Sequence, residues 1–145
     1  DVISHKWQSA RRVEFDTYID GVFVPHQRSD GMVISTPTGS TAYALSGGGP
    51  ILHPQLEAMV LVPICPHTLS NRPIVVHSDS VVEVRLRKKQ QTSAQLTCDG
   101  QTTLDLDGGD RIVVRRKERP IRLIHPPGHD HYAVLRSKLH WGHGL

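Results

Sequence analysis

The chain has few of the residues that usually build covalent, metal or stacking sites. It contains only two cysteines, Cys65 and Cys98, which lack the spacing of a metal site. We therefore expect free thiols in a reducing cytosol and no disulfide framework. Aromatic residues make up 5% of the chain, so few stacking platforms are present for nucleic-acid bases. The longest apolar run, Met59–Val62, is too short to cross a bilayer, and we recognise no signal peptide.

Two common phosphate-binding motifs are absent as well. The chain has no Gly-Lys-Ser/Thr of a Walker A loop and no Gly-x-Gly-x-x-Gly dinucleotide fingerprint. Its 145 residues fit one domain, and a domain of this size buries roughly 68–70% of its unfolded surface. The hydrophobic content of 37% and the charged content of 21% are ordinary. A formal net charge of +3 suits a polyanionic ligand without selecting one.

A predicted strand, a hydroxyl-rich turn and a helix start follow one another within residues 30–54. Met32–Ile34 is a short apolar run that fits a buried strand. Thr38–Thr41 suits a helix start, and about two turns of helix over residues 42–46 would end at Gly47–Gly49. Backbone N–H groups and hydroxyls in such a turn can converge on an anion, phosphate above all. An ordinary capped helix explains the local chemistry equally well.

The rest of the chain predicts a mainly β, sandwich-like layered domain with two short helices. Val13–Ile19 alternates with period two, and Asp20-Gly21 and Asp99-Gly100 are two-residue hairpin signals. The second helix is predicted over His131–Leu139. Pro54–Pro73 is rich in proline and is predicted to be mostly loop, with a short strand at Met59–Val62. Asp1–Ile3 is interpreted as the end of a strand or of a loop. The other predicted strands are Val22–Val24, Met32–Ser35, Ile74–His77, Val82–Arg87, Ala94–Cys98, Thr102–Leu106, Ile112–Arg116 and Ile121–Ile124.

One string in the chain is far more specific than its local chemistry. Ser35-Thr36-Pro37-Thr38-Gly39-Ser40-Thr41-Ala42-Tyr43, followed by Ser46 and Gly48-Gly49, resembles the signature of the NAD kinases. The resemblance covers essentially all 145 residues. It implies phosphoryl transfer from ATP or polyphosphate to the adenosine 2′-hydroxyl of NAD, with a divalent metal, Mg²⁺, giving NADP. Further matches occur at Tyr18–Gly21, Arg28–Gly31, His53-Pro54, Pro66–Ser70, Arg72-Pro73, Leu123–Pro126 and Ser137–Trp141.

The resemblance extends to only part of such an enzyme. The family has an N-terminal nucleotide-binding domain with a Gly-Gly-Asp-Gly loop, and residues 1–145 match only the C-terminal, NAD-binding domain. We therefore expect this chain to contribute no catalytic residue. Gly108-Gly109-Asp110-Arg111 departs from the loop at its fourth residue, and we interpret it as a hairpin turn. The resemblance also implies a cytoplasmic homo-oligomer, a dimer or a tetramer.

The resemblance assigns NAD contacts to residues spread along the chain. Asp30 matches a contact near the nicotinamide, and Arg28 is its neighbour. Asp1 matches an acidic partner of the adenine or ribose, and Tyr43 offers a ring face and an O–H. The ordinary alternatives are a surface Arg–Asp pair, a frayed terminus at Asp1, core packing of Tyr43, or solvated side chains. The remaining assigned contacts are Arg11, Thr41, Ala42, Ala44, Leu45, Ser46 and Gln101.

Two other functional classes remain open at this stage. A relative of the lipid kinases, of the diacylglycerol type, would share the two-domain plan. A basic β-domain that binds nucleic acid is a non-enzyme alternative. Its best candidate segment is Arg85–Gln90, which also fits a charged hairpin end. The ten histidines do not fall at structural-zinc spacings, so we expect solvated histidines and no metal site.

Overall fold

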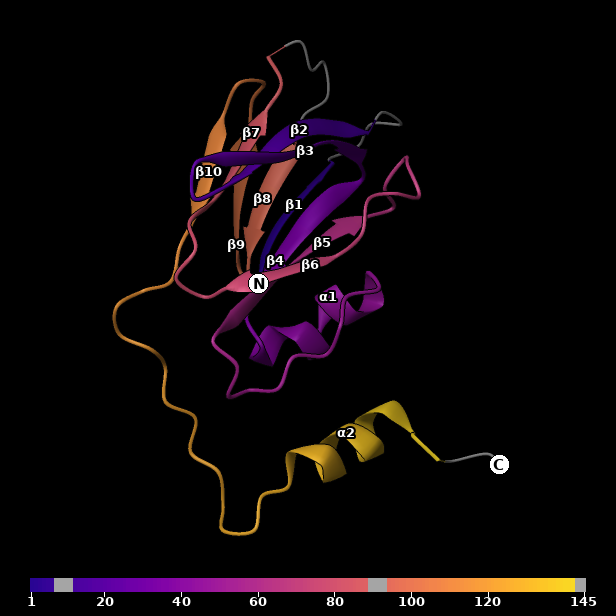
Figure 1. The fold of residues 1–145 in the computed structure, drawn as a ribbon, viewed down its shortest axis with the longest axis vertical. Helices are drawn as coiled ribbons and strands as arrows, with labels where there is room; N and C mark the ends of the chain where they lie inside the picture. Colours follow the sequence, from indigo (N-terminus) through magenta and orange to yellow (C-terminus); the bar gives the residue numbers. More distant parts are fainter. Residues whose placement is uncertain (7–11, 89–93, 143–145) are drawn as a thin grey trace.

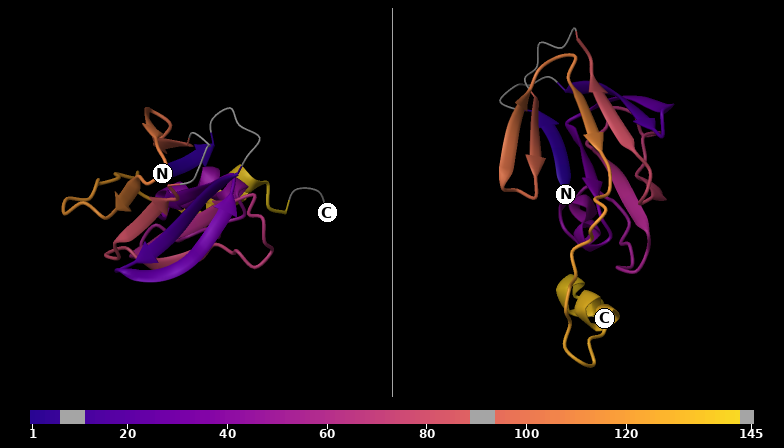
Figure 2. Two further views of the ribbon diagram at one scale, coloured as in Figure 1. Left: turned by 90° about the horizontal axis from the view of Figure 1, so that it is seen from above. Right: turned by 90° about the vertical axis from the view of Figure 1, so that its left-hand side faces the viewer.

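The structure is a computed structural model that describes residues 1–6, 12–88 and 94–142, in which two antiparallel sheets face one another (Figures 1 and 2). The prediction of a mainly β, two-layered domain is confirmed. The six-stranded sheet comprises, in spatial order, β6 (Ile74–His77), β5 (Ala58–Ile64), β4 (Gly31–Ser35), β1 (Val2–Lys6), β8 (Ala94–Cys98) and β9 (Thr102–Leu106). The four-stranded sheet comprises β10 (Arg111–Val114), β7 (Val82–Leu86), β2 (Val13–Ile19) and β3 (Val22–Ser29).

The core between the sheets is formed by every second side chain of the strands, because successive side chains of a strand point to opposite faces. In β2, Val13 and Phe15 are fully buried, while the residues between them are partly exposed. Met32 and Ile34 of β4 face them from the six-stranded sheet and belong to the same buried cluster. Burial of each such side chain stabilises the fold by roughly 1.5–3 kcal/mol. The predicted hairpin turns are confirmed, because both residues of Asp20-Gly21 and of Asp99-Gly100 have positive φ.

The other face of the six-stranded sheet carries a second, smaller core. Val33 of β4 and Val60 and Val62 of β5 point to this outer face and pack with Ala44 and Leu52. The cover consists of a 3-10 helix, η1 (Thr38–Thr41), and one α-helical turn, α1 (Tyr43–Ser46). The predicted two-turn helix is therefore split at Ala42, whose φ and ψ of −102° and −129° are not helical.

Strand β5 contains the short strand predicted at Met59–Val62 within the proline-rich stretch, and it is longer, seven residues. Its proline, Pro63, is opposite Met32 of β4 in the ladder. On its other side β5 pairs with β6 only from Ala58 to Leu61. Pro63 therefore lies beyond the end of β6, where its missing N–H interrupts no ladder.

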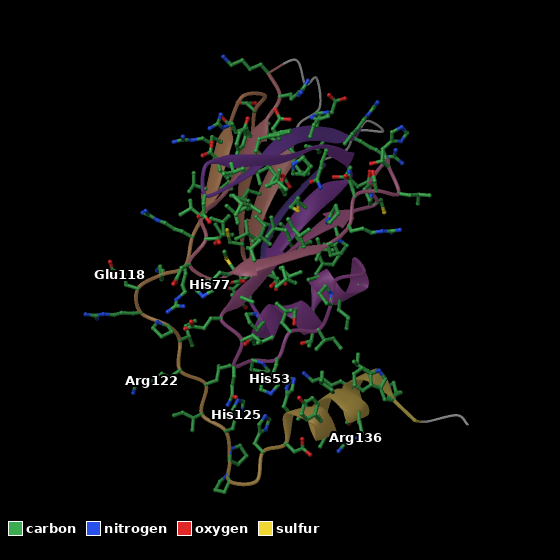
Figure 3. The ribbon with its side chains drawn as sticks, viewed as in Figure 1. His53, His77, Glu118, Arg122, His125 and Arg136 are labelled. Carbon is green, nitrogen blue, oxygen red and sulfur yellow. The ribbon has the colours of Figure 1, made fainter. Side chains whose placement is uncertain are left out.

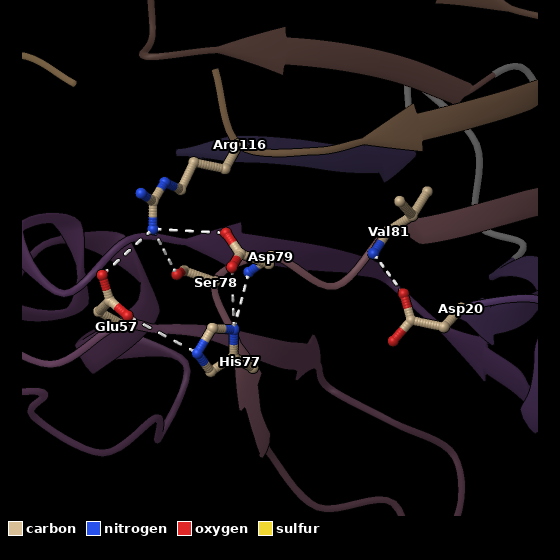
Figure 4. Close-up of polar contacts among 7 residues, drawn as sticks. All are labelled: Asp20, Glu57, His77, Ser78, Asp79, Val81 and Arg116. Atoms are coloured by element: carbon tan, nitrogen blue, oxygen red, sulfur yellow. Dashed lines mark hydrogen bonds and ion pairs between the residues drawn. The ribbon is translucent and has the colours of Figure 1, made fainter. Parts of the chain in front are cut away.

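The predicted strand at Ile121–Ile124 is wrong. Residues 115–130 form an extended arm without ladder pairing, and Ile121 and Ile124 are 89% and 95% exposed. Pro120 and Pro126 bracket the segment and remove N–H donors that a ladder would need. The arm begins at Arg116, whose guanidinium lies near Glu57, Ser78 and Asp79 in a network that includes His77 (Figure 4).

The arm leads to α2 (His131–Leu139), which confirms the predicted helix. The Asp130 carboxylate caps it by accepting hydrogen bonds from the N–H groups of Tyr132 (2.8 Å) and Ala133 (3.2 Å). These bonds, from Ala133 first and then Tyr132, lower the pKa of Asp130 below the ordinary value of 3.8. α2 lies beyond α1, where the rings of His131 and His53 meet with centroids 5.0 Å apart (Figure 3). No described helix has the length and hydropathy to cross a membrane.

We predict that Asp130→Ala unravels the first turn of α2, because two N–H groups lose their acceptor. Hydrogen exchange at the amides of residues 131–139 should become faster in the variant. Asp130→Asn is the matched control, since asparagine caps equally well and does not titrate. In the unchanged protein the lowered pKa makes the cap stabilising above pH 3.8, and this contribution is lost as the pH falls through the folded-state pKa. Equal exchange rates in all three proteins would contradict the assignment.

Candidate functional site

The hydroxyl-rich turn after β4 is held together by its own hydrogen bonds. The Ser40 hydroxyl is buried, donates to the Pro37 carbonyl (2.6 Å) and accepts from the Leu52 N–H (2.9 Å). It therefore ties the start of η1 to the segment that returns after α1. Thr41 Oγ1 lies 3.3 Å from the Thr38 carbonyl and donates to it. The Ser40 hydroxyl thus has a structural role, and the Thr41 hydroxyl is half-buried at the surface.

Asp1 lies at the same end of β4. Antiparallel pairing of β1 with β4 and β8 places Val2 opposite Ile34 and Cys98. The Ser35 hydroxyl donates to Asp1 Oδ1 at 2.8 Å, and the Asp99 N–H donates to the Asp1 carbonyl at 2.8 Å. The Asp1 side chain is only 13% exposed. The carboxylate is therefore oriented by its neighbours, and the frayed-terminus alternative does not describe it.

Gly39 explains how this carboxylate comes so close to η1. A Cβ atom at Gly39 would lie 2.0 Å from Asp1 Oδ1 and 2.5 Å from Ser35 Oγ, closer than any side chain tolerates. Only glycine leaves room for the carboxylate above the backbone of the 3-10 helix. Gln101 follows the Asp99-Gly100 turn at this same end of the sheet, where its N–H donates to the Cys98 carbonyl (3.0 Å).

Helix α1 presents its remaining side chains along the outer face of the sheet. Ala44 is fully buried and anchors the turn. Tyr43 is 45% exposed, so its ring is not part of the core and the core-packing alternative is wrong. Leu45 is half-buried, while Ala42 and Ser46 are exposed. The assigned residues of this segment therefore form an accessible surface on a buried anchor.

Arg28 and Asp30 lie at the opposite end of β4. The Asp30 N–H donates to the Ile64 carbonyl (2.9 Å), and its carboxylate is 3.9 Å from Arg12 Nε. Arg12 also contacts the ring of His67, with 2.7 Å between Nη1 and Nδ1. Arg28 Nε is 3.6 Å from Glu14 Oε1. The structure thus places Arg12 beside Asp30. Arg11, which the resemblance assigns to the NAD site, lies outside the described residues.

The residues that the resemblance assigns to NAD binding form an elongated row rather than a compact pocket. The row runs from Asp1 and Gln101 at one end of β4, along residues 41–46, to Arg28 and Asp30 at the other end. Asp1 and Asp30 flank the five residues of β4, a span of about 14–17 Å at the usual rise of a strand. The segment from η1 through α1 to Gly47 bridges the two ends, because Gly39 in η1 contacts Asp1, while a Cβ at Gly47 would lie 2.7 Å from Ile64 Cδ1. The row suits an extended ligand with hydrogen-bonding groups at both ends.

Comparison with known proteins decides the family. Residues 1–126 match the family described as the ATP-NAD kinase C-terminal domain. The chain belongs to this family. It is 54% identical, over all 145 residues, to the NAD kinases of Nitrosococcus oceani and Chromohalobacter salexigens, and it spans half the length of each.

Two solved structures of this kinase group share the fold. Yeast NADH kinase complexed with NADH has a TM-score of 0.89 and 30% identity, with 99% of this chain and 44% of that chain covered. An NAD kinase from Archaeoglobus fulgidus in complex with ATP has a TM-score of 0.72 and 34% identity, with 81% and 44% covered. Membership of the NAD kinase family favours a dinucleotide site over the lipid-kinase and nucleic-acid alternatives.

Within this NAD kinase domain, the described residues contain no group of three or more His, Cys, Asp or Glu placed to hold a metal ion. Of the histidines near the C-terminus, His125 and His129 stack with ring centroids 3.9 Å apart, and His131 contacts His53. Gly108-Gly109-Asp110 forms the turn between β9 and β10, where Asp110 Oδ2 accepts from the Asp107 N–H (2.8 Å). The predicted hairpin turn is wrong, because β9 and β10 belong to different sheets. The resemblance pointed to Asp1 but did not reveal the contributions of Ser35 and Gly39, although both lie within the signature string.

We predict that Gly39→Ala destabilises the full-length protein by about 1–3 kcal/mol, because the new methyl group overlaps the Asp1 carboxylate. Asp1→Ala should remove the part of that penalty that comes from the carboxylate, while the overlap with Ser35 Oγ remains, so the two substitutions should be non-additive. Urea unfolding of both single variants and the double variant measures the coupling. Thr38→Ala, which is on the exposed side of η1, is the control and should combine additively with Asp1→Ala. Additive effects of Gly39→Ala and Asp1→Ala would show that the two residues do not meet.

Proposed function

We propose that this chain is the NAD-binding part of an NAD kinase. The supporting observation is the row along β4 and α1, in which the Ser35 hydroxyl donates to the Asp1 carboxylate, Gly39 leaves room for it, and the Tyr43 ring is exposed. In the proposed reaction the adenosine 2′-oxygen of NAD attacks the terminal phosphorus of ATP or polyphosphate. The hydroxyl proton passes to a base, and ADP or the shortened polyphosphate leaves. The donor loop and the base would belong to the remainder of the full-length protein.

The residues of the row would bind and orient NAD without joining the chemistry. The Asp1 carboxylate can accept hydrogen bonds from ribose hydroxyls or from the adenine amine, and the Ser35 hydroxyl fixes its direction. The Tyr43 ring is free to stack on the adenine or to donate its O–H. Holding the acceptor in place lowers the barrier by removing rotational freedom before reaction. The neighbouring Thr41, Ala42, Ala44, Leu45 and Ser46 would form the wall of the site, and Gln101 would border it.

The distance between Asp1 and Asp30 affects whether one chain or two chains contact each bound NAD. We propose that Arg28 and Asp30 serve the nicotinamide side, either of the ligand bound to the same chain or of one bound to a second copy. A dimer or tetramer whose interface borders the row would allow the second arrangement. We assign the cytoplasm as the compartment. In this proposal the divalent metal, Mg²⁺, enters with ATP rather than on ligands of this chain.

We predict that the full-length protein forms NADP from NAD with ATP or polyphosphate, whereas the isolated 145-residue chain binds NAD weakly and forms none. The reason is that the acceptor site and the donor loop would lie in different parts of the protein. Enzymatic cycling of NADP measures both reactions. Clear NADP formation by the pure 145-residue chain would contradict the division of roles. A folded full-length protein that forms no NADP with either donor would contradict the proposed function.

We predict that Tyr43→Ala in the full-length protein weakens NAD binding by roughly 1–3 kcal/mol, the usual range for stacking of a base on an aromatic ring. That is about one to two decades in affinity. Since the ring is 45% exposed, the thermal midpoint should change little. ATP binding should be unchanged. Tyr18→Ala, on the four-stranded sheet, is the matched control and should leave NAD affinity intact. A sharply lowered midpoint with normal NAD affinity in the folded fraction would refute the binding role.

A further inference from the structure

The first half of the arm carries the excess positive charge of the chain. Residues 115–122, here called the basic segment, contain one carboxylate, Glu118, and five cations: Arg115, Arg116, Lys117, Arg119 and Arg122. The formal net charge of the segment is therefore +4, whereas that of the whole chain is +3, which leaves −1 for all other residues. Figure 3 shows Glu118 and Arg122 on the arm, away from the two sheets.

Most cations of the basic segment have no counter-ion in the described part of the chain. On the four-stranded sheet, each exposed arginine of β7 and β10 lies within 4 Å of a carboxylate, as does Arg87 after β7. Arg116 is also paired, with Glu57 and Asp79. The other four cations of the segment are exposed and form no ion pair with a described residue. Unpaired cations gathered in one segment attract polyanions.

The basic segment is held at both ends. At its start, the Arg116 guanidinium lies 3.6 Å from Glu57, 3.4 Å from Asp79 and 3.0 Å from the Ser78 hydroxyl (Figure 4). Beyond its end, the arm leads to α2, which meets the body at His53. The segment forms no helix or ladder. Eight residues of extended chain can span up to about 26 Å, far more than a triphosphate.

The basic segment begins at the end of the six-stranded sheet where the proposed adenosine site lies. Ser35, which donates to the Asp1 carboxylate, is opposite Val60 near the start of β5. Glu57, which pairs with Arg116, comes directly before that strand. A phosphoryl donor must approach the adenosine 2′-hydroxyl at this same end, so the cations are placed to attract it.

The composition of the arm favours a phosphate chain over a nucleic acid. Residues 115–130 contain no Phe, Tyr or Trp. Proteins that bind single-stranded nucleic acid combine cations with aromatic rings on which the bases stack. Arginine and lysine without such rings can still bind phosphate oxygens. A linear polyphosphate, which is charged along its whole length and has no bases, fits the basic segment.

We propose that the basic segment binds linear inorganic polyphosphate and thereby holds the phosphoryl donor beside the NAD row. The donor role rests on the proposed function, whereas binding of the polyanion does not. A long chain contacts all the unpaired cations of the segment together, while a triphosphate contacts only some of them. In the reaction, the terminal phosphoryl group passes to the adenosine 2′-oxygen, the hydroxyl proton passes to a base, and the shortened polyphosphate leaves. The cations hold the donor and take no part in the transfer.

Calorimetric titration of the full-length protein with long-chain sodium polyphosphate and with sodium tripolyphosphate tests the site. With both concentrations counted in phosphate units, the long chain should bind at least tenfold tighter at low salt. The triple variant Lys117→Gln, Arg119→Gln and Arg122→Gln should weaken its binding at least tenfold. By analogy with single-stranded nucleic acids, the slope of log affinity against log salt should become about 2 smaller, because each lost contact contributes about 0.7.

A second triple variant, Arg85→Gln, Arg87→Gln and Arg111→Gln, is the matched control, because it removes the same charge from the four-stranded sheet. It should leave polyphosphate binding nearly unchanged. In NADP formation, the variant of the basic segment should raise the KM for polyphosphate at least tenfold and leave kcat unchanged. The KM for ATP should change less than twofold, whereas a merely structural role would affect both donors. If neither donor yields NADP, the proposed function fails, and the titration still tests the site.

Three results of the titration would overturn the proposal. If the variant of the basic segment binds long-chain polyphosphate as tightly as the unchanged protein, the segment is not the site. If the control variant loses as much affinity, the effect is one of overall charge. If a thymidine oligonucleotide with the same number of phosphates binds as tightly as polyphosphate, the segment recognises nucleic acid instead.

Discussion

Strands β4 and β5 are buried on both faces, and the rest of the structure depends on covering them. All five residues of β4 are buried, although a strand of an antiparallel sheet often leaves one face to solvent. One face is covered by the four-stranded sheet. The other is covered by η1 and α1, which come close because Gly47 and Gly49 have no side chain: a Cβ at Gly49 would lie 2.7 Å from Val62 Cγ2. Residues of the signature string therefore close the core and shape the proposed ligand surface at once.

Local patterns predicted much of this fold correctly. Alternation in Val13–Ile19, the turns at Asp20-Gly21 and Asp99-Gly100, and the apolar spacing of α2 are short-range features that the sequence displays directly. The error concerns a ladder that would need a distant partner, because Ile121–Ile124 remains unpaired despite its apolar composition. The short strand predicted at Met59–Val62 is present, and β4 and β6 extend it to Ala58–Ile64.

In the candidate site, too, the features set by neighbouring residues could be predicted from the sequence, and those set by distant strand pairing could not. The signature string located η1 and α1, and the exposure of Tyr43 agrees with its assigned role. The pairing of β1 with β4 and β8 could not be predicted from local patterns, yet it places Asp1 beside Ser35 and beside the turn before Gln101. The same pairing separates Asp1 from Asp30, which the resemblance had assigned to one ligand.

Because successive residues of β4 face opposite sides of the sheet, Met32 packs in the core between the sheets while Val33 anchors the cover.

A crystal structure of the full-length protein with NAD tests the central claim most directly. The account predicts a dinucleotide along α1, with a ligand hydroxyl or amine within about 3.2 Å of the Asp1 carboxylate and the Tyr43 ring against the ligand. A bound dinucleotide that contacts neither Asp1 nor Tyr43 would contradict it.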